Sequence, residues 1–154
     1  MYQRILVPTD GSPIAAVAAQ AAIELAKAFG SEIVALSVAQ PEPVVPLAEG
    51  AGVIAGPGPE AMLEEARKHV ERVAHAAARA GVKCTILASL GYSPADEIVD
   101  AAKRYGCDLI YIASHGRRGL SRLIAGSVTQ RVLAYAPVPV MVLRPQPGAQ
   151  DAGA

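Results

Sequence analysis

Short apolar runs alternate with longer helix-like segments along the chain, and this alternation restricts the possible folds more than any other feature. The apolar runs, which we expect to be strands, cover residues 5–7, 32–39, 83–88, 108–113 and 138–143. The segments expected to be helices cover residues 15–28, 59–80, 94–105 and 127–135. This order predicts an α/β fold with a mostly parallel sheet, because parallel neighbours need long crossover connections. The strands are apolar almost throughout, which is typical of a sheet covered by helices on both faces.

The helix boundaries are marked by proline and glycine. Ser12 and Pro13 have the residue types of an N-cap and a first helical position, and Gly30 is suited to a left-handed C-terminal position. The same order recurs with Pro59 and Gly81 and with Pro94 and Gly106, where Ser93 and Asp96 add a capping-box pattern. On the second helix an apolar stripe is expected to face the core, formed by Leu63, Ala66, Val70, Val73 and Ala77.

Composition narrows the class of protein. The chain has 154 residues, of which 52% are apolar and 18% charged, and 14 Lys+Arg balance 14 Asp+Glu. This length suffices for one domain. A neutral chain with few aromatic residues argues against nucleic-acid binding. No stretch reaches the ~18 apolar residues that span a bilayer, and the N-terminal apolar run is too short for a signal peptide. We expect a cytoplasmic protein.

Two segments lie outside the alternation. Residues 40–58 are rich in proline and glycine, and a connection of this length predicts a mobile loop or lid. Residues 145–154 are small and polar, and we expect a disordered tail there. Residues 1–144 are therefore expected to form a single domain.

In an open parallel sheet, ligands bind beyond the carboxyl ends of the strands where the strand order reverses, which points to the segments after the first and fourth strands. The first is Pro8-Thr9-Asp10-Gly11. The second runs from Ala113 to Gly119 and continues to Gly126-Ser127, with arginines at 117, 118, 122 and 131. Glycines and a helix N-terminus can hold an anion, although the same residues also allow a plain turn with a solvated basic face. The position after a strand favours the anion site.

The remaining candidate residues point to little chemistry. Asp10 suits a turn former or an N-cap, and its place at the switch point favours a ligand contact instead. Ser127 suits a helix N-cap, a phosphate ligand or both. His115 has no carboxylate nearby in sequence to orient it, so a structural role is expected. We expect His69 and His75 to lie on a helix surface without function. Cys84 and Cys107 are too far apart for a CxxC site and are expected to be small core residues.

Several known phosphate and nucleophile motifs are missing. No lysine follows a glycine as a Walker A loop requires, and only Gly11 stands where a dinucleotide GxGxxG would begin. The clustered acids of a phosphorelay receiver and the Gly-x-Ser-x-Gly elbow of a hydrolase are missing too. The chain also lacks the His-x-Gly-His and Ser-Gly-Gly-x-Asp-Ser patterns of nucleotidyl-transfer enzymes on related folds, which makes that class the least favoured.

Over residues 2–144 the chain resembles the universal stress protein family, whose nucleotide-binding members carry Gly-x2-Gly-x9-Gly-Ser/Thr. Here the pattern begins at Ala113 in place of glycine and continues with Gly116 and Gly126-Ser127. The opening segment 4–12 and the closing Ala136-Pro137-Val138-Pro139-Val140 are also similar. The resemblance implies a Rossmann-like fold of the adenine-nucleotide alpha-hydrolase type, with a five-stranded sheet in the order 3-2-1-4-5.

The resemblance also implies an ATP site. Pro8, Thr9 and Asp10 would flank the adenosine, and the backbone of Val38 would meet adenine. The residues near ribose and phosphates would be Ala113, Gly116, Arg117, Gly119, Gly126, Ser127, Val128 and Thr129, with Mg²⁺ bridging the phosphates. No protein side chain is expected to bind the metal. A positive φ at position 113 would cost alanine roughly 1 kcal/mol, whereas a backbone contact alone would tolerate its methyl group.

The last strand predicts self-association. Val138, Val140 and Val142 alternate with Pro139, Met141 and Leu143, so both faces are apolar. An apolar edge strand is an aggregation hazard unless it is covered or paired. We expect a homodimer through residues 138–143 with Val138, Val140, Met141 and Val142 at the interface, as the resemblance also implies.

The function expected from these features is that of a dimeric ATP-binding regulatory module in stress response, with a protein partner that the sequence does not identify. It is not expected to be an enzyme, since no residue stands out as an activator of water, and any ATP hydrolysis should be slow. The alternative is a nucleotide-free dimeric interaction module of the same fold, which Ala113 favours.

Overall fold

The computed structural model describes residues 1–41, 56–116 and 125–144. Strands and helices alternate in it without interruption: β1 (Arg4–Pro8), α1 (Pro13–Phe29), β2 (Glu32–Ala39), α2 (Pro59–Arg79), β3 (Cys84–Leu90), α3 (Pro94–Arg104), β4 (Leu109–Ala113), α4 (Ser127–Tyr135) and β5 (Val140–Leu143). Most of the segment 40–58, residues 117–124 with Arg117 and Gly119, and the tail 145–154 lie outside the described residues.

The five strands form one parallel sheet in the order β3-β2-β1-β4-β5, which confirms the predicted fold class and strand order. The strand order reverses at β1, which lies between β2 and β4. The register pairs Leu6 of β1 with Val34 of β2 and with Ile110 of β4. The carboxyl ends of β1 and β4 are therefore neighbours at one edge of the sheet.

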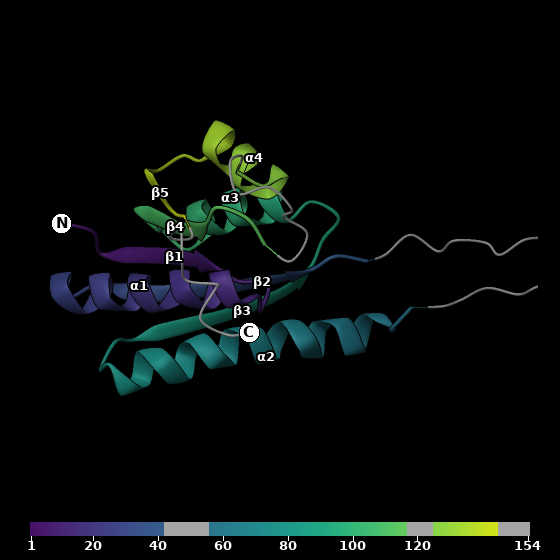
Figure 1. Cartoon of the computed structure of the whole chain (residues 1–154), viewed down its shortest axis with the longest axis horizontal. Helices are drawn as coiled ribbons and strands as arrows, with labels where there is room; N and C mark the ends of the chain where they lie inside the picture. Colours follow the sequence, from purple (N-terminus) through teal and green to yellow (C-terminus); the bar gives the residue numbers. More distant parts are fainter. Residues whose placement is uncertain (42–55, 117–124, 145–154) are drawn as a thin grey trace, which may run out of the picture.

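Helices cover both faces of the sheet, with α3 and α4 on one side and α2 on the other (Figure 1). Ile5 and Val7 of β1 pack with α1 and α2, whereas Leu6 between them packs with α3 and α4. Side chains alternate between the faces of a strand, so this short apolar run contributes to both cores. All three side chains are fully buried.

The helix boundaries form as the sequence predicts. The Ser12 hydroxyl caps α1 by accepting a hydrogen bond from the Ala15 N–H at 3.3 Å, and Ser93 caps α3 in the same way. Proline lies at the start of α1, α2 and α3. The glycines that follow these helices, Gly30, Gly81 and Gly106, all have a positive φ, between 60 and 74°. Glycine adopts such a φ without the steric cost that a Cβ imposes.

One predicted cap and one predicted boundary were wrong. Helix α4 covers residues 127–135 as expected, but its N-cap is Gly126, whose N–H donates to the Ser114 carbonyl, and Ser127 is the first helical residue. The last strand begins at Val140 rather than Val138. The reason is that Pro139 lacks the N–H that a ladder requires. Val138 still packs against the α3 and α4 side of the core.

Ion pairs connect elements that are distant in sequence. At the amino ends of the strands, the Glu32 carboxylate lies 2.8 Å from Lys83 Nζ and 3.2 Å from an Arg4 guanidinium nitrogen. On the other side of the sheet, Arg131 of α4 binds Asp96 of α3 through two nitrogens at 3.1 and 3.3 Å. The second pair joins α3 to α4, which carries part of the predicted site.

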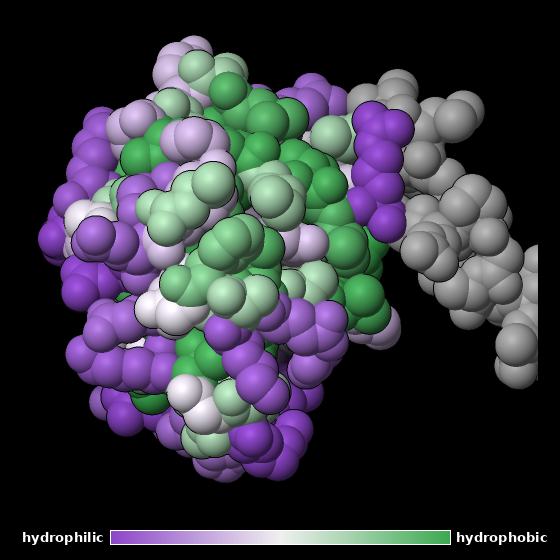
Figure 2. All heavy atoms as spheres, turned by 90° about the vertical axis from the view of Figure 1, so that its left-hand side faces the viewer, coloured by the Kyte–Doolittle hydropathy of each residue, from purple (hydrophilic) through white to green (hydrophobic). Residues whose placement is uncertain are grey.

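The outer surface mixes apolar and polar side chains. Figure 2 shows hydrophobic residues across the middle and upper part of the face at the left of Figure 1, and hydrophilic residues toward its left and lower margins. None of the helices that the structure describes is long and apolar enough to cross a bilayer.

Candidate functional site

The loops after β1 and β4 meet through Asp10 and Gly116. One Asp10 carboxylate oxygen accepts a hydrogen bond from the Ser12 N–H at 3.0 Å, which orients the side chain. The other oxygen lies against Gly116, where a Cβ added to the glycine would overlap it. The sequence prediction that the two loops converge on one site therefore agrees with the arrangement of these residues.

The turn after β1 is held by one bond to β2 and one bond within the turn. The Thr9 N–H donates to the Leu36 carbonyl of β2 at 2.8 Å, and the Thr9 hydroxyl accepts from the Gly11 N–H at 3.2 Å. The φ of Gly11 is 77°. A residue with a side chain rarely adopts this conformation. The Thr9 side chain is buried, so its hydroxyl stabilises the turn in this structure.

Val38 lies two residues beyond the end of the β1–β2 pairing. The register of β1 with β2 ends at Pro8 and Leu36, and the Thr9 bond extends it by one contact. Backbone groups alternate sides along a strand, so the Val38 carbonyl faces the same side as that of Leu36, past the end of β1. This is the edge of the sheet where the resemblance places adenine.

The loop after β4 is closed by contacts between its two ends. The Gly126 N–H donates to the Ser114 carbonyl at 2.7 Å, and the Thr129 hydroxyl donates to the Ala113 carbonyl at 2.9 Å. A Cβ at Gly126 would lie 3.3 Å from the His115 Cα, so the two chain segments are in close contact. These bonds place the first turn of α4 directly beside the carboxyl end of β4.

The N-terminus of α4 has the character of an anion site. Its cap residue Gly126 has no side chain to bond the first amides, and the first turn contains no acidic residue. The first N–H groups of a helix carry a partial positive charge and attract anions. Ser127 is exposed, and Val128 is half-buried beside it. Thr129 is buried, and its hydroxyl is engaged by β4.

Ala113 does not strain the backbone. No non-glycine residue in the described ranges has a positive φ, and Ala113 is the last residue of β4. Its side chain is 6% exposed and packs in the core with α1 and α2. The substitution of the first motif glycine by alanine therefore carries none of the steric cost that a left-handed conformation would impose.

His69 was predicted to be a surface residue without function, and the surface part of that prediction was wrong. It is 6% exposed and lies under the turn after β1, where its ring occupies the space that a Cβ at Gly11 would need. Its Nδ1 is 3.3 Å from the Ser37 hydroxyl of β2. The sequence did contain a signal, because His69 follows Ala66 by three residues and precedes Val73 by four, on the apolar stripe of α2.

The other polar and thiol groups give little sign of catalysis. His115 Nδ1 lies 3.1 Å from the Ser114 hydroxyl. Within the described residues, no group of three or more His, Cys, Asp or Glu could hold a metal ion. Burial raises the pKa of the Cys107 thiol to about 11 and also raises the pKa of the half-buried Cys84. A raised pKa makes a thiol unreactive, because the thiolate is the nucleophile.

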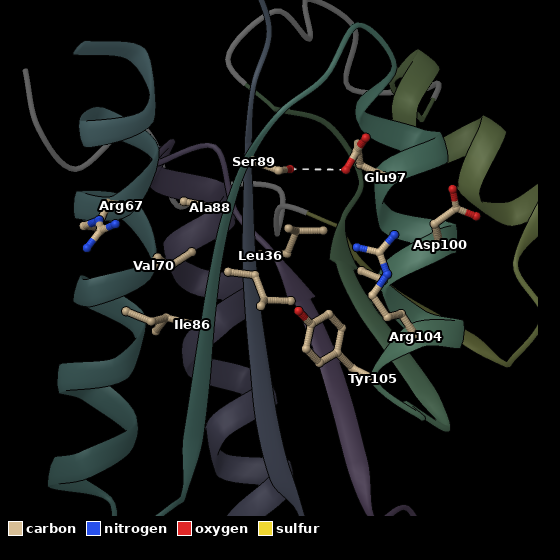
Figure 3. A pocket seen from close by; sticks show the side chains of 12 residues that line it. Leu36, Arg67, Val70, Ile86, Ala88, Ser89, Glu97, Asp100, Arg104 and Tyr105 are labelled. Carbon is tan, nitrogen blue, oxygen red and sulfur yellow. Dashed lines mark hydrogen bonds between the residues drawn. The ribbon is translucent and has the colours of Figure 1, made fainter. Parts of the chain in front are cut away.

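A separate hollow of about 440 Å³ runs along β3, one of the two edge strands of the described sheet, with α2 on one side and α3 on the other (Figure 3). Leu36 and Tyr105 are among its apolar lining residues, Arg67 lines it from α2, and the Ser89 hydroxyl donates to Glu97 at 3.3 Å. None of the predicted nucleotide-binding residues lines this hollow. The convergence of the two loops, rather than this hollow, marks the candidate site, because the glycines and the helix N-terminus that suit an anion are at the loops.

Comparisons by family model, by sequence and by structure all point to the same family. The universal stress protein family matches residues 1–144. The universal stress protein MJ0531 of Methanocaldococcus jannaschii is 37% identical over 145 residues, which cover 94% of this chain and 83% of that one. The solved structure of MJ0577 from the same organism has a TM-score of 0.72 and 27% identity, covering 95% of this chain and 98% of that chain.

A universal stress protein of Archaeoglobus fulgidus, solved in complex with dAMP, has a TM-score of 0.68 and 22% identity over 93% of this chain and 98% of that chain. At this level of identity the likeness concerns the fold.

Proposed function

The chain belongs to the universal stress protein family, and we propose that it is a dimeric regulatory module that binds ATP. The observation that carries the proposal is the convergence of Asp10, Gly116 and the α4 N-terminus at the switch point of the sheet. This is where open α/β sheets bind their ligands. That the fold can hold an adenine nucleotide is supported by the Archaeoglobus protein, which was solved with dAMP.

The residues present fit an adenine nucleotide with a phosphate chain. Gly116 and Gly126 allow the two loops to approach closely, since a Cβ at Gly116 would overlap the Asp10 carboxylate and one at Gly126 would press on His115. A bound phosphate would face the first N–H groups of α4 near Ser127 and Val128. Asp10 and the backbone of Val38 lie on the side of β1 and β2, where they would bind the nucleoside part.

Mg²⁺ would be held by the phosphates. Neutralising phosphate charge is the chemistry that the ion supplies when bound. The role of this chain is then to bind and orient the nucleotide. A regulatory role follows if the nucleotide-bound and nucleotide-free forms differ in shape or in the protein that they bind. We place the module in the cytoplasm and expect its output to be contact with another protein rather than catalysis.

The proposed dimer forms through β5. In the described part of the sheet, β5 has β4 on one side and no strand on the other. Met141 is 39% exposed, and Val140 and Val142 are half-buried. Pairing with a second copy about a two-fold axis would satisfy the open backbone groups and cover the apolar side chains.

The nucleotide-free module remains the competing function. Ala113 was the sequence feature that favoured it. Because the φ of Ala113 is not positive, its methyl group gives no steric reason for the loss of nucleotide binding.

The test combines the nucleotide content of freshly purified protein with calorimetric titration of the stripped protein with Mg-ATP. Gly126→Val is the site variant, because the added side chain would press on the His115 backbone. Gly56→Val is the matched control, because a Cβ at Gly56 meets nothing within 4 Å. Bound ATP, or micromolar affinity lost only in Gly126→Val, supports the proposal. No nucleotide and no heat of binding in the unmodified protein would support the nucleotide-free module.

A further inference from the structure

A buried histidine of α2 lies beneath the turn that connects β1 to α1. His69 is 6% exposed, although it comes from a helix that faces solvent along much of its length. A Cβ built at Gly11 would lie 2.5 Å from His69 Cδ2 and 3.0 Å from Cε1. The ring is therefore in direct contact with the turn at Gly11.

The turn depends on its local geometry at this point. Gly11 has a positive φ, and its N–H donates to the Thr9 hydroxyl. The next N–H, that of Ser12, donates to the Asp10 carboxylate. Both bonds orient side chains that the proposed site uses. A shift of Gly11 would therefore move Thr9 and Asp10 together.

Both nitrogens of the His69 ring have a polar neighbour. Nδ1 lies 3.3 Å from the Ser37 hydroxyl of β2, and Nε2 lies 3.7 Å from a carboxylate oxygen of Glu65, one turn earlier on α2. Ser, His and Glu in this order resemble a hydrolytic triad. The Ser37 side chain is only 2% exposed and forms part of the sheet interior, so a substrate has no access to it. Orientation of the ring is the role that these contacts support.

We propose that His69 is a positioning residue: its ring, bonded to Ser37 and with Glu65 beside Nε2, holds the turn at Gly11 in the conformation that presents Thr9 and Asp10. The inference rests on the proposed nucleotide function for its consequence, since the turn is half of that site. It connects α2, which otherwise only covers the sheet, to the ligand side of the molecule. Buried polar groups with partners on two elements commonly fix one arrangement of those elements.

The experiment compares His69→Ala and His69→Gln with His75→Ala, a matched control on the exposed face of the same helix. Two quantities are measured on the full chain: amide exchange at Gly11 and Ser12 without nucleotide, and the Kd for Mg-ATP. Loss of one hydrogen bond and of the ring contact should raise the exchange rate about tenfold and the Kd about tenfold in His69→Ala. His69→Gln, whose amide reaches the same region, should recover part of both, and His75→Ala should change neither.

The outcomes separate the two proposals. If the unmodified protein binds Mg-ATP and His69→Ala binds it equally well, the positioning role is overturned while the nucleotide function stands. Faster exchange throughout β4 and β1 in His69→Ala would indicate general destabilisation and would also overturn the positioning role. If the unmodified protein binds no nucleotide but exchange rises only at Gly11 and Ser12, the nucleotide function fails and the positioning of the turn stands. No change in exchange refutes the positioning role whether or not nucleotide binds.

Discussion

Asp10 and Gly116 lie against each other across the carboxyl ends of β1 and β4, so closely that one carboxylate oxygen occupies the place of a Cβ at residue 116. The two residues come from different loops and are far apart in sequence. The absence of a side chain at residue 116 therefore allows the Asp10 carboxylate its present orientation. Glycine at 116 is thus required by the position of Asp10, and not by its backbone angle, since its φ is not positive.

The first prediction follows from that contact. Gly116→Ala should force the Asp10 carboxylate away from its bond with the Ser12 N–H, because the new methyl group takes its place. The displaced carboxylate can turn toward solvent, so the fold should persist while the Kd for Mg-ATP rises about tenfold. Calorimetry gives the Kd, and circular dichroism reports the fold. Gly56→Ala, with open space at its Cβ, serves as the control, and equal affinities in the two variants would contradict the prediction.

The second prediction concerns the bond between α4 and β4. Thr129→Val keeps the shape of a buried side chain but removes the hydroxyl that donates to the Ala113 carbonyl at 2.9 Å. A buried acceptor that loses its donor costs about 1–2 kcal/mol of the free energy of unfolding. Urea denaturation measures this change. Thr85→Val is the control, at an exposed position of β3, and it should change stability far less, as surface substitutions usually do. A similar loss in both variants would mean that the Thr129 bond contributes nothing specific.

The third prediction concerns pH. The Ser93 side chain and the Arg131 guanidinium lower the pKa of the Asp96 carboxyl below its usual value. A group whose pKa is lowered on folding adds stability above its unfolded pKa of about 3.9, and that contribution disappears as the pH falls through the folded pKa. Asp96→Asn should therefore be less stable than the unmodified protein at neutral pH, by a small amount because the pair is exposed.

The free energy of unfolding of both proteins, followed by urea titration from neutral to acidic pH, checks this prediction. The difference should shrink and vanish below the folded-state pKa of Asp96. A difference that stays constant across this range would assign the effect to the asparagine itself rather than to the charge.

Much of the fold could be predicted because its signals are local. Proline at the start of a helix and glycine after its end act through their own φ angles, so α1 was expected to end at Gly30 and does so. The apolar run 32–39 coincides with β2. The N-cap of α4 could not be predicted in this way, because Gly126 is fixed by the Ser114 carbonyl across a loop.

In the candidate site, too, the parts set by local signals could be predicted and the parts set by distant contacts could not. Its two loops could be located, because a parallel sheet places ligands at the strand ends where the order reverses. The contribution of α2 could not be located, since helical periodicity places His69 on the apolar stripe without saying that the ring would meet Gly11. The roles of individual nucleotide-binding residues, from Pro8 to Thr129, stay predictions. So do those of Arg117 and Gly119, which lie outside the described residues.

The last prediction tests the proposed dimer by comparing the two edge strands of the sheet. Met141 of β5 and Ile86 of β3 are nearly equally exposed, at 39% and 40%. A lysine in either strand adds a charge that is costly to bury between paired edges, which is how natural edge strands resist association. Met141→Lys should therefore convert a dimer into a monomer in sedimentation velocity at micromolar concentration, whereas Ile86→Lys should leave the dimer intact. Dissociation by Ile86→Lys alone would place the interface at β3 instead, and a monomeric unmodified protein would exclude the dimer at that concentration.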